Sequence, residues 1–154
     1  MIGPMTNFYI LVIVIVGAGV GAQIAVNARL GAATMAPLWA ANINFAVSAI
    51  VGLTALGVSI LLGQPAAPSA AIWTAPKWVW LGGVFGATYV LLAIVLTRTV
   101  GVAVLSAATI VGQLGASLLI DHYGWLGATV HRLSATRVIG AAFLIIGVAL
   151  IRWK

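Results

Sequence analysis

Hydrophobic residues run along this chain in five long stretches, and polar residues gather between them. An α-helix needs about 20 apolar residues to cross the hydrocarbon core of a bilayer, and each stretch is close to that length. The sequence therefore predicts an all-α membrane protein of five transmembrane helices, at about 7–26, 37–62, 78–96, 102–120 and 136–151. At about 1.5 Å per residue the second helix would be roughly 39 Å long, so we expect it to tilt or to project beyond the hydrocarbon.

The residues that flank these stretches also indicate a membrane. All six tryptophans fall near predicted helix ends, where an indole ring favours the interface between lipid and water. The longest connection, residues 63–77, contains three prolines and predicts an extended surface loop. No linker and no direct repeat divides the chain, so residues 1–154 are predicted to form a single integral membrane domain.

Composition excludes a water-soluble domain. Charged residues make up 5% of the chain and hydrophobic residues 64%, whereas a soluble domain carries about 25% charged residues. The net charge of +6 comes from cations spread singly along the chain. This spacing favours helix ends at lipid headgroups and gives no reason to expect a nucleic-acid partner.

The inventory of reactive side chains is short. The chain has no cysteine, two histidines and one carboxylate side chain, Asp121. Disulfides and thiolate chemistry are therefore excluded, and no metal site or cofactor is predicted. No Ser/His/Asp set and no carboxylate pair lies within the helices, so we do not expect an enzyme.

Cations are divided almost evenly between the two sides of the predicted membrane domain. With five helices, the side of the N-terminus receives three cations and the other side four, namely Lys77, Arg132 and Arg137 against Arg29, Arg98, Arg152 and Lys154. A bias in these numbers is the main determinant of orientation. Either the chain inserts both ways and gives copies of opposite orientation, or other features decide a weak preference.

Polar side chains within the predicted helices recur at helical spacing. The rows are Gln23 and Asn27 in the first helix, Asn44 and Ser48 in the second, and Ser106, Thr109, Gln113 and Ser117 in the fourth. One interpretation is hydrogen bonding between helices, at about 1 kcal/mol for each bond. The other is a hydrated cleft that receives a polar ligand, because four amides exceed what five short helices need for adhesion.

Small residues form three pairs, each one helical turn apart: Gly17 and Gly21, Gly82 and Gly86, Gly112 and Ala116. Such pairs allow helix backbones to approach closely, and a gating hinge is the alternative. Asp121 continues the polar row of the fourth helix at its C-terminal end, where the macrodipole disfavours an anion. We therefore expect a cationic partner from among His122, Arg132 and Arg137, in a structural ion pair or in a gating or ligand-contacting role.

Longer motifs resemble the small YdcZ-like branch of the drug/metabolite transporter superfamily. They are QIAVNARLG at 23–31, NF at 44–45, GGVFGATYV at 82–90, GQLGASLLIDHYG at 112–124 and RVIG at 137–140. The resemblance implies half of a ten-helix inverted-repeat transporter in a prokaryotic inner membrane, completed by a second copy or a paralogue. Proton-coupled multidrug exporters of this superfamily carry a glutamate in the first helix. Here Gln23 and Asn27 stand at the polar positions of that helix, and neither can titrate.

These observations together predict a small-solute transporter that works by alternating access as an antiparallel homodimer. The alternative is a non-transporting accessory protein or a lipid-binding scaffold. The substrate cleft is expected to be lined by Gln23, Asn27, Asn44, Ser48, Gln113 and Ser117, with Tyr89 as a wall. Asp121, at the mouth of this cleft, is expected to form an ion pair or a gate with Arg132 and Arg137. Arg29 could face an anionic group of the solute or a lipid headgroup.

Overall fold

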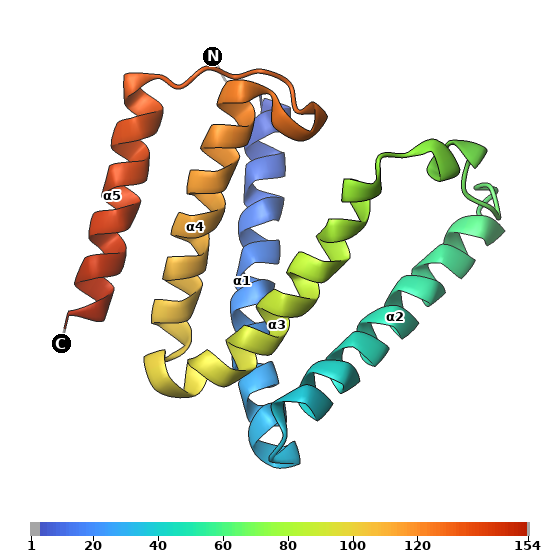
Figure 1. Ribbon diagram of the computed structural model, residues 1–154, viewed down its shortest axis with the longest axis horizontal. Coiled ribbons are helices and arrows are strands. Elements are labelled where there is room, and N and C mark those ends of the chain that lie inside the picture. The colour runs from blue at the N-terminus through green and yellow to red at the C-terminus, as the bar shows by residue number, and fades with distance from the viewer. Residues whose placement is uncertain (1–3, 154) are drawn as a thin grey trace. The chain divides into compact units, whose positions relative to one another are not determined.

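The computed structural model describes residues 4–153, and over this range it contains only helices and their connections (Figure 1). The five long helices are α1 (Pro4–Thr34), α2 (Pro37–Leu61), α3 (Leu81–Val100), α4 (Val102–Tyr123) and α5 (Ala135–Arg152). Three short 3-10 turns lie between them, η1 (Ala70–Thr74), η2 (Lys77–Trp80) and η3 (Trp125–Gly127). Each long helix is long and apolar enough to cross a membrane, which confirms the prediction of five transmembrane helices.

Helix α1 is longer than the sequence pattern predicts. The pattern ends the first helix near residue 26, whereas α1 continues to Thr34. Asn27 and Arg29 are polar, but neither residue breaks a helix. The helix ends instead at Met35, whose φ of 54° is left-handed, just before Pro37 begins α2. At about 1.5 Å per residue α1 is roughly 46 Å long, more than the hydrocarbon core of about 30 Å.

The chain packs as two compact units, one made of residues 22–98 and the other of residues up to 21 and from 99 onward. We call them the central unit and the terminal unit. The central unit holds α2, nearly all of α3 and the part of α1 from residue 22 onward. The terminal unit holds the start of α1, α4 and α5.

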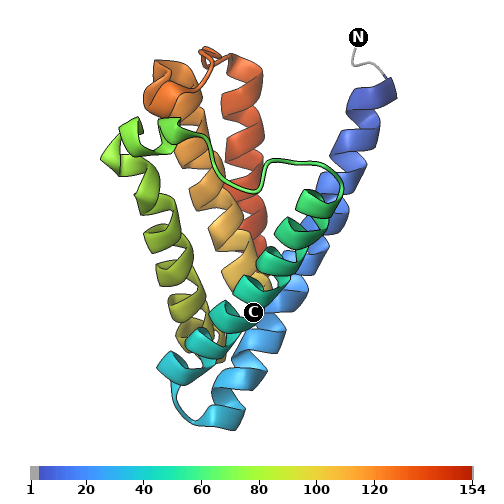
Figure 2. The same ribbon diagram turned by 90° about the vertical axis from the view of Figure 1, so that its right-hand side faces the viewer.

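The core of the central unit lies where α1 ends, α2 begins and α3 ends. Its buried members are Ala40, Ala41 and Ile94, and the partly buried residues packed against them are Leu30, Phe45, Val90 and Leu91. Helices α2 and α3 converge at this core and diverge toward the η1–η2 connection (Figure 2). Side chains are therefore buried near the core, and most become exposed as the two helices separate.

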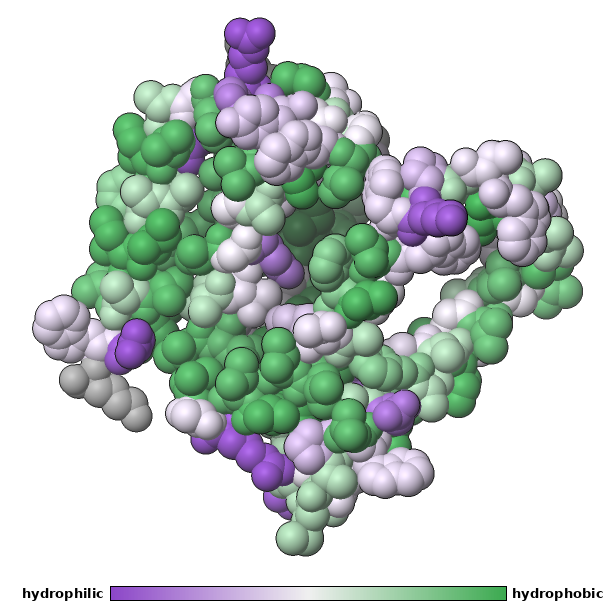
Figure 3. Space-filling view, viewed as in Figure 1, coloured by the Kyte–Doolittle hydropathy of each residue, from purple (hydrophilic) through white to green (hydrophobic). Residues whose placement is uncertain are grey.

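In the terminal unit α4 and α5 lie side by side and antiparallel, joined by residues 124–134 (Figure 1). Most large apolar side chains of α5 are exposed, including Phe143 and Ile146, and so are Ile110 and Leu119 of α4. Apolar residues likewise cover much of the molecule's visible face (Figure 3). In water such a surface would aggregate, but in a bilayer it faces lipid.

Candidate functional site

The polar row of α1 continues into the core of the central unit. Gln23, Asn27 and Gly31 follow one another at intervals of four residues and therefore share one face of the helix. A Cβ added to Gly31 would lie 2.5 Å from Cγ2 of Ile94 in α3, which shows that this face meets α3. Asn27 is 4% exposed and Gln23 is partly buried.

On α2 the predicted polar row starts from a buried alanine. Ala40, Asn44 and Ser48 are spaced four residues apart, and they change from buried through partly buried to exposed. Asn42, on a different face, donates from Nδ2 to the carbonyl oxygen of Leu38 at 2.8 Å and so binds its own helix. The Asn44 amide makes no such bond within residues 4–153. It lies at the edge of the central core with its hydrogen-bonding capacity unused.

Tyr89 of α3 is one turn before the buried face formed by Ala93 and Thr97. The hydroxyl of Thr97 donates to the carbonyl oxygen of Ala93 within the same helix. The Tyr89 hydroxyl is also buried, yet it has no hydrogen-bond partner among the residues that the structure describes. A buried hydroxyl left in this state costs about 1–3 kcal/mol, so Tyr89 is the polar group of the central unit with the strongest need for a partner.

Gln113 and Ser117 lie on α4 in the terminal unit, and both are exposed. Thr109, one turn earlier on the same row, donates to the carbonyl oxygen of Leu105 at 2.9 Å. The Gln113 amide forms no bond of this kind within the described part of the chain. Of these three residues, Thr109 therefore binds its own helix, while Gln113 and Ser117 present polar groups outward.

The connection between α4 and α5 brings Asp121 and Arg137 together. Nη2 of Arg137 lies 3.2 Å from Oδ2 of Asp121, and its Nη1 donates to the carbonyl oxygen of His131 at 3.2 Å. Backbone groups add two bonds, His131 N–H to the Asp121 carbonyl at 2.8 Å and Leu133 N–H to His122 Nδ1 at 3.2 Å. Arg137 is thus the partner of Asp121, whereas His122 accepts a backbone hydrogen bond.

Gly124 makes this connection possible for two separate reasons. It caps α4 with a left-handed φ of 67°, a conformation that costs other residues about 1–2 kcal/mol. A Cβ at this position would also lie 2.8 Å from Cγ2 of Val130. A glycine at a helix end is a local signal for such a cap, but no local signal pointed to the hydrogen bonds of His131 and Leu133, because these form only where the chain folds back toward α4.

Replacing Asp121 with Asn is expected to lower Tm by at most about 4 °C. The Asp121 and Arg137 side chains are about one-third exposed, and such pairs contribute up to about 1 kcal/mol, or about 2–4 °C for a chain of this size. Asp121→Asn keeps the backbone bond from His131. Arg137→Gln should lower Tm similarly, the double variant should lose little more, and Arg132→Gln serves as the control. Additive losses in the double variant would contradict a direct pair.

Comparison with known proteins identifies one family. A family model described as "Putative inner membrane exporter, YdcZ" matches residues 8–150. This range includes all the polar rows described above and nearly all of each long helix. No curated protein and no solved structure matches the chain.

Proposed function

Because this chain belongs to the YdcZ family and is a multi-pass inner membrane protein, we propose that it transports a small polar solute by alternating access. It does so as one half of an antiparallel homodimer, with the solute held in a cleft between the two copies. The observation that carries this proposal is the set of polar groups without partners in the membrane-spanning helices, above all the buried Tyr89 hydroxyl. A bound solute or the water of a cleft would satisfy them.

The case for a second copy rests on an odd helix count and on unused packing surfaces. Two oppositely inserted copies of a five-helix chain generate the inverted-repeat symmetry on which many transporters are built. A Cβ added at Gly17, Gly82 or Gly112 would meet no atom within 4 Å. The predicted small-residue pairs are therefore free to pack against another chain. The balance of three cations against four permits both orientations.

The chemistry of the proposed cleft favours a neutral polar solute. Gln23, Asn27, Asn44 and Gln113 supply amides, and Ser48, Ser117 and Tyr89 supply hydroxyls, all of which recognise ligands by hydrogen bonds. The carboxylate of Asp121 is neutralised by Arg137, so it is not free to hold a lone cation at the mouth. Because Gln23 and Asn27 do not titrate, proton exchange on the first helix is not part of this proposal.

Water access to Gln113 tests the proposed cleft. The chain has no cysteine, so an introduced cysteine is the only thiol. We expect Gln113→Cys and Asn44→Cys to react at least about tenfold faster with a charged, water-soluble thiosulfonate than cysteines that face lipid, because the reactive thiolate forms where water reaches it. The matched controls are Leu119→Cys and Ile50→Cys, whose native side chains are exposed and apolar and lie about 120° around the same helices.

The comparison within each helix is decisive. A cysteine at 113 that reacts as slowly as one at 119, together with one at 44 as slow as one at 50, would place these amides in lipid or in dry contacts. That result would overturn the cleft, whatever the oligomeric state of the protein.

A further inference from the structure

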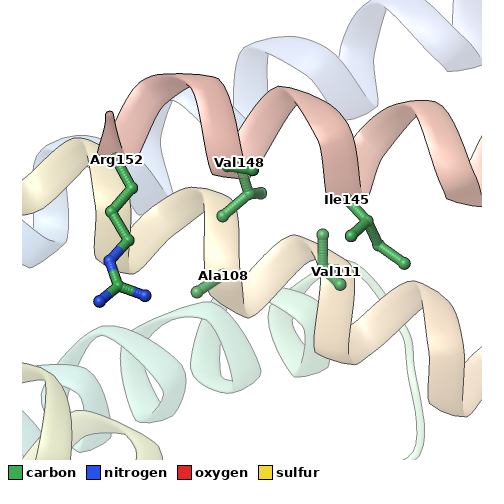
Figure 4. A pocket seen from close by; sticks show the side chains of 6 residues that line it. Ala108, Val111, Ile145, Val148 and Arg152 are labelled. Atoms are coloured by element: carbon green, nitrogen blue, oxygen red, sulfur yellow. The ribbon is translucent and has the colours of Figure 1, made fainter. Parts of the chain in front are cut away.

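A groove of about 310 Å³ runs between α4 and α5 in the terminal unit. Ala108 and Val111 of α4 line one side, and Ile145, Val148, Ala149 and Arg152 of α5 line the other (Figure 4). The Arg152 side chain extends from the last turn of α5 toward α4, with its guanidinium at one end of the groove (Figure 4). The other lining side chains are all apolar, so the groove has apolar walls and one positively charged end.

Arg152 has no acidic side chain of its own chain to neutralise it. Asp121 is the chain's only carboxylate side chain, and it is already paired with Arg137. That pair also lies at the opposite end of the hairpin, because Asp121 is near the end of α4 and Arg137 near the start of α5. An anion that pairs with Arg152 would therefore come from outside the side chains of this protein.

Depth in the bilayer limits what that anion can be. Helix α5 has 18 residues, about 27 Å at 1.5 Å per residue, which nearly equals the hydrocarbon thickness of about 30 Å. With α5 spanning the membrane, Arg152 lies at the level of the lipid headgroups. The exposed indole of Trp153 follows it, as is typical of the interface.

We propose that this groove binds one anionic phospholipid, with its phosphate on Arg152 and an acyl chain along the apolar walls. A guanidinium binds a phosphate with two parallel hydrogen bonds. An apolar cavity of about 150 Å³ holds benzene, so the groove has room for roughly a dozen carbon atoms of a lipid tail. The apolar lining offers nothing to a neutral polar solute. This site is therefore separate from the proposed transport cleft and does not depend on it.

Native mass spectrometry of the full chain in detergent tests the proposal. The probes are phosphatidylglycerol and phosphatidylcholine with identical acyl chains. Wild type should retain phosphatidylglycerol at collision energies that remove phosphatidylcholine. Arg152→Gln should weaken phosphatidylglycerol binding by about tenfold or more, because hydrogen bonds to a charged group are lost. Arg132→Gln removes an equal charge from the exposed α4–α5 connection and should leave binding unchanged.

A second variant tests the acyl chain. Ala149→Leu fills the groove and keeps Arg152, so it should reduce retention of phosphatidylglycerol while circular dichroism and Tm report an intact fold. Equal loss in Arg132→Gln and Arg152→Gln would assign binding to overall charge. Displacement of the lipid by millimolar inorganic phosphate would assign the site to a free anion. Loss of dimer with unchanged lipid occupancy in either groove variant would make the groove an interface between copies. Each of these three results overturns the proposal.

Discussion

Two variants of this chain locked in opposite orientations are each expected to stay monomeric and to form dimers only when they are produced together. The native balance of three cations against four is small enough for three added lysines to decide the orientation. Lysines at Gln64, Ser69 and Thr74 give six cations against four, and lysines at Met35, Thr99 and Trp153 give seven against three. These six positions are exposed and lie in connections or at the ends of helices.

The cysteine-free background makes the orientation measurable. A single cysteine at Ala67, an exposed residue between α2 and η1, should be labelled from outside intact cells in about half of the wild-type molecules. The reason is that the numbers of cations on the two sides are nearly equal, so neither orientation is strongly favoured. In the locked variants labelling should be all or none. Size-exclusion chromatography with light scattering then reports the dimer.

A balanced variant supplies the control for this experiment. Gln64→Lys combined with Thr99→Lys adds one cation to each side and should keep both orientations and the dimer. A locked variant that elutes as a dimer when produced alone would show that the two copies are parallel. The inverted-repeat arrangement would then be wrong.

Gly31→Ala is expected to destabilise the protein by about 1–3 kcal/mol, the usual cost of inserting a group into a filled core. The new Cβ would lie 2.5 Å from Cγ2 of Ile94, and Ile94 is fully buried with an exposure of 0%. Without such a contact, alanine would stabilise a helix by about 0.5–1 kcal/mol relative to glycine. Reversible unfolding in mixed detergent micelles measures the difference.

Two further sets of variants show whether the contact is the cause. Gly52→Ala and Gly57→Ala place a Cβ in open space and should be neutral or slightly stabilising. Ile94→Ala removes the opposing methyl, so it should cost less in the Gly31→Ala background than in wild type. If the Gly31→Ala variant were as stable as the Gly57→Ala variant, the close approach of α1 and α3 would be contradicted.

The sequence by itself determined that this protein lies in a lipid bilayer and that it forms five transmembrane helices. Both follow from the length of apolar stretches, because every backbone polar group in a bilayer must be bonded within its own helix. The need of Asp121 for a cation was also local, since it comes from the dipole of its own helix. The motifs between Gln23 and Gly140 were enough to identify the family, which the match over residues 8–150 confirms.

Only the tertiary structure decided which groups meet. Helical spacing assigns a residue to a face but does not say which helix that face touches. Three pairs of small residues were expected at close contacts, yet it is Gly31, outside all three, that meets Ile94. Likewise Arg137 reaches Asp121, 16 residues away, because Gly124 reverses the chain. Contacts of this kind depend on where distant elements return in space, and no pattern within a single helix contains that information.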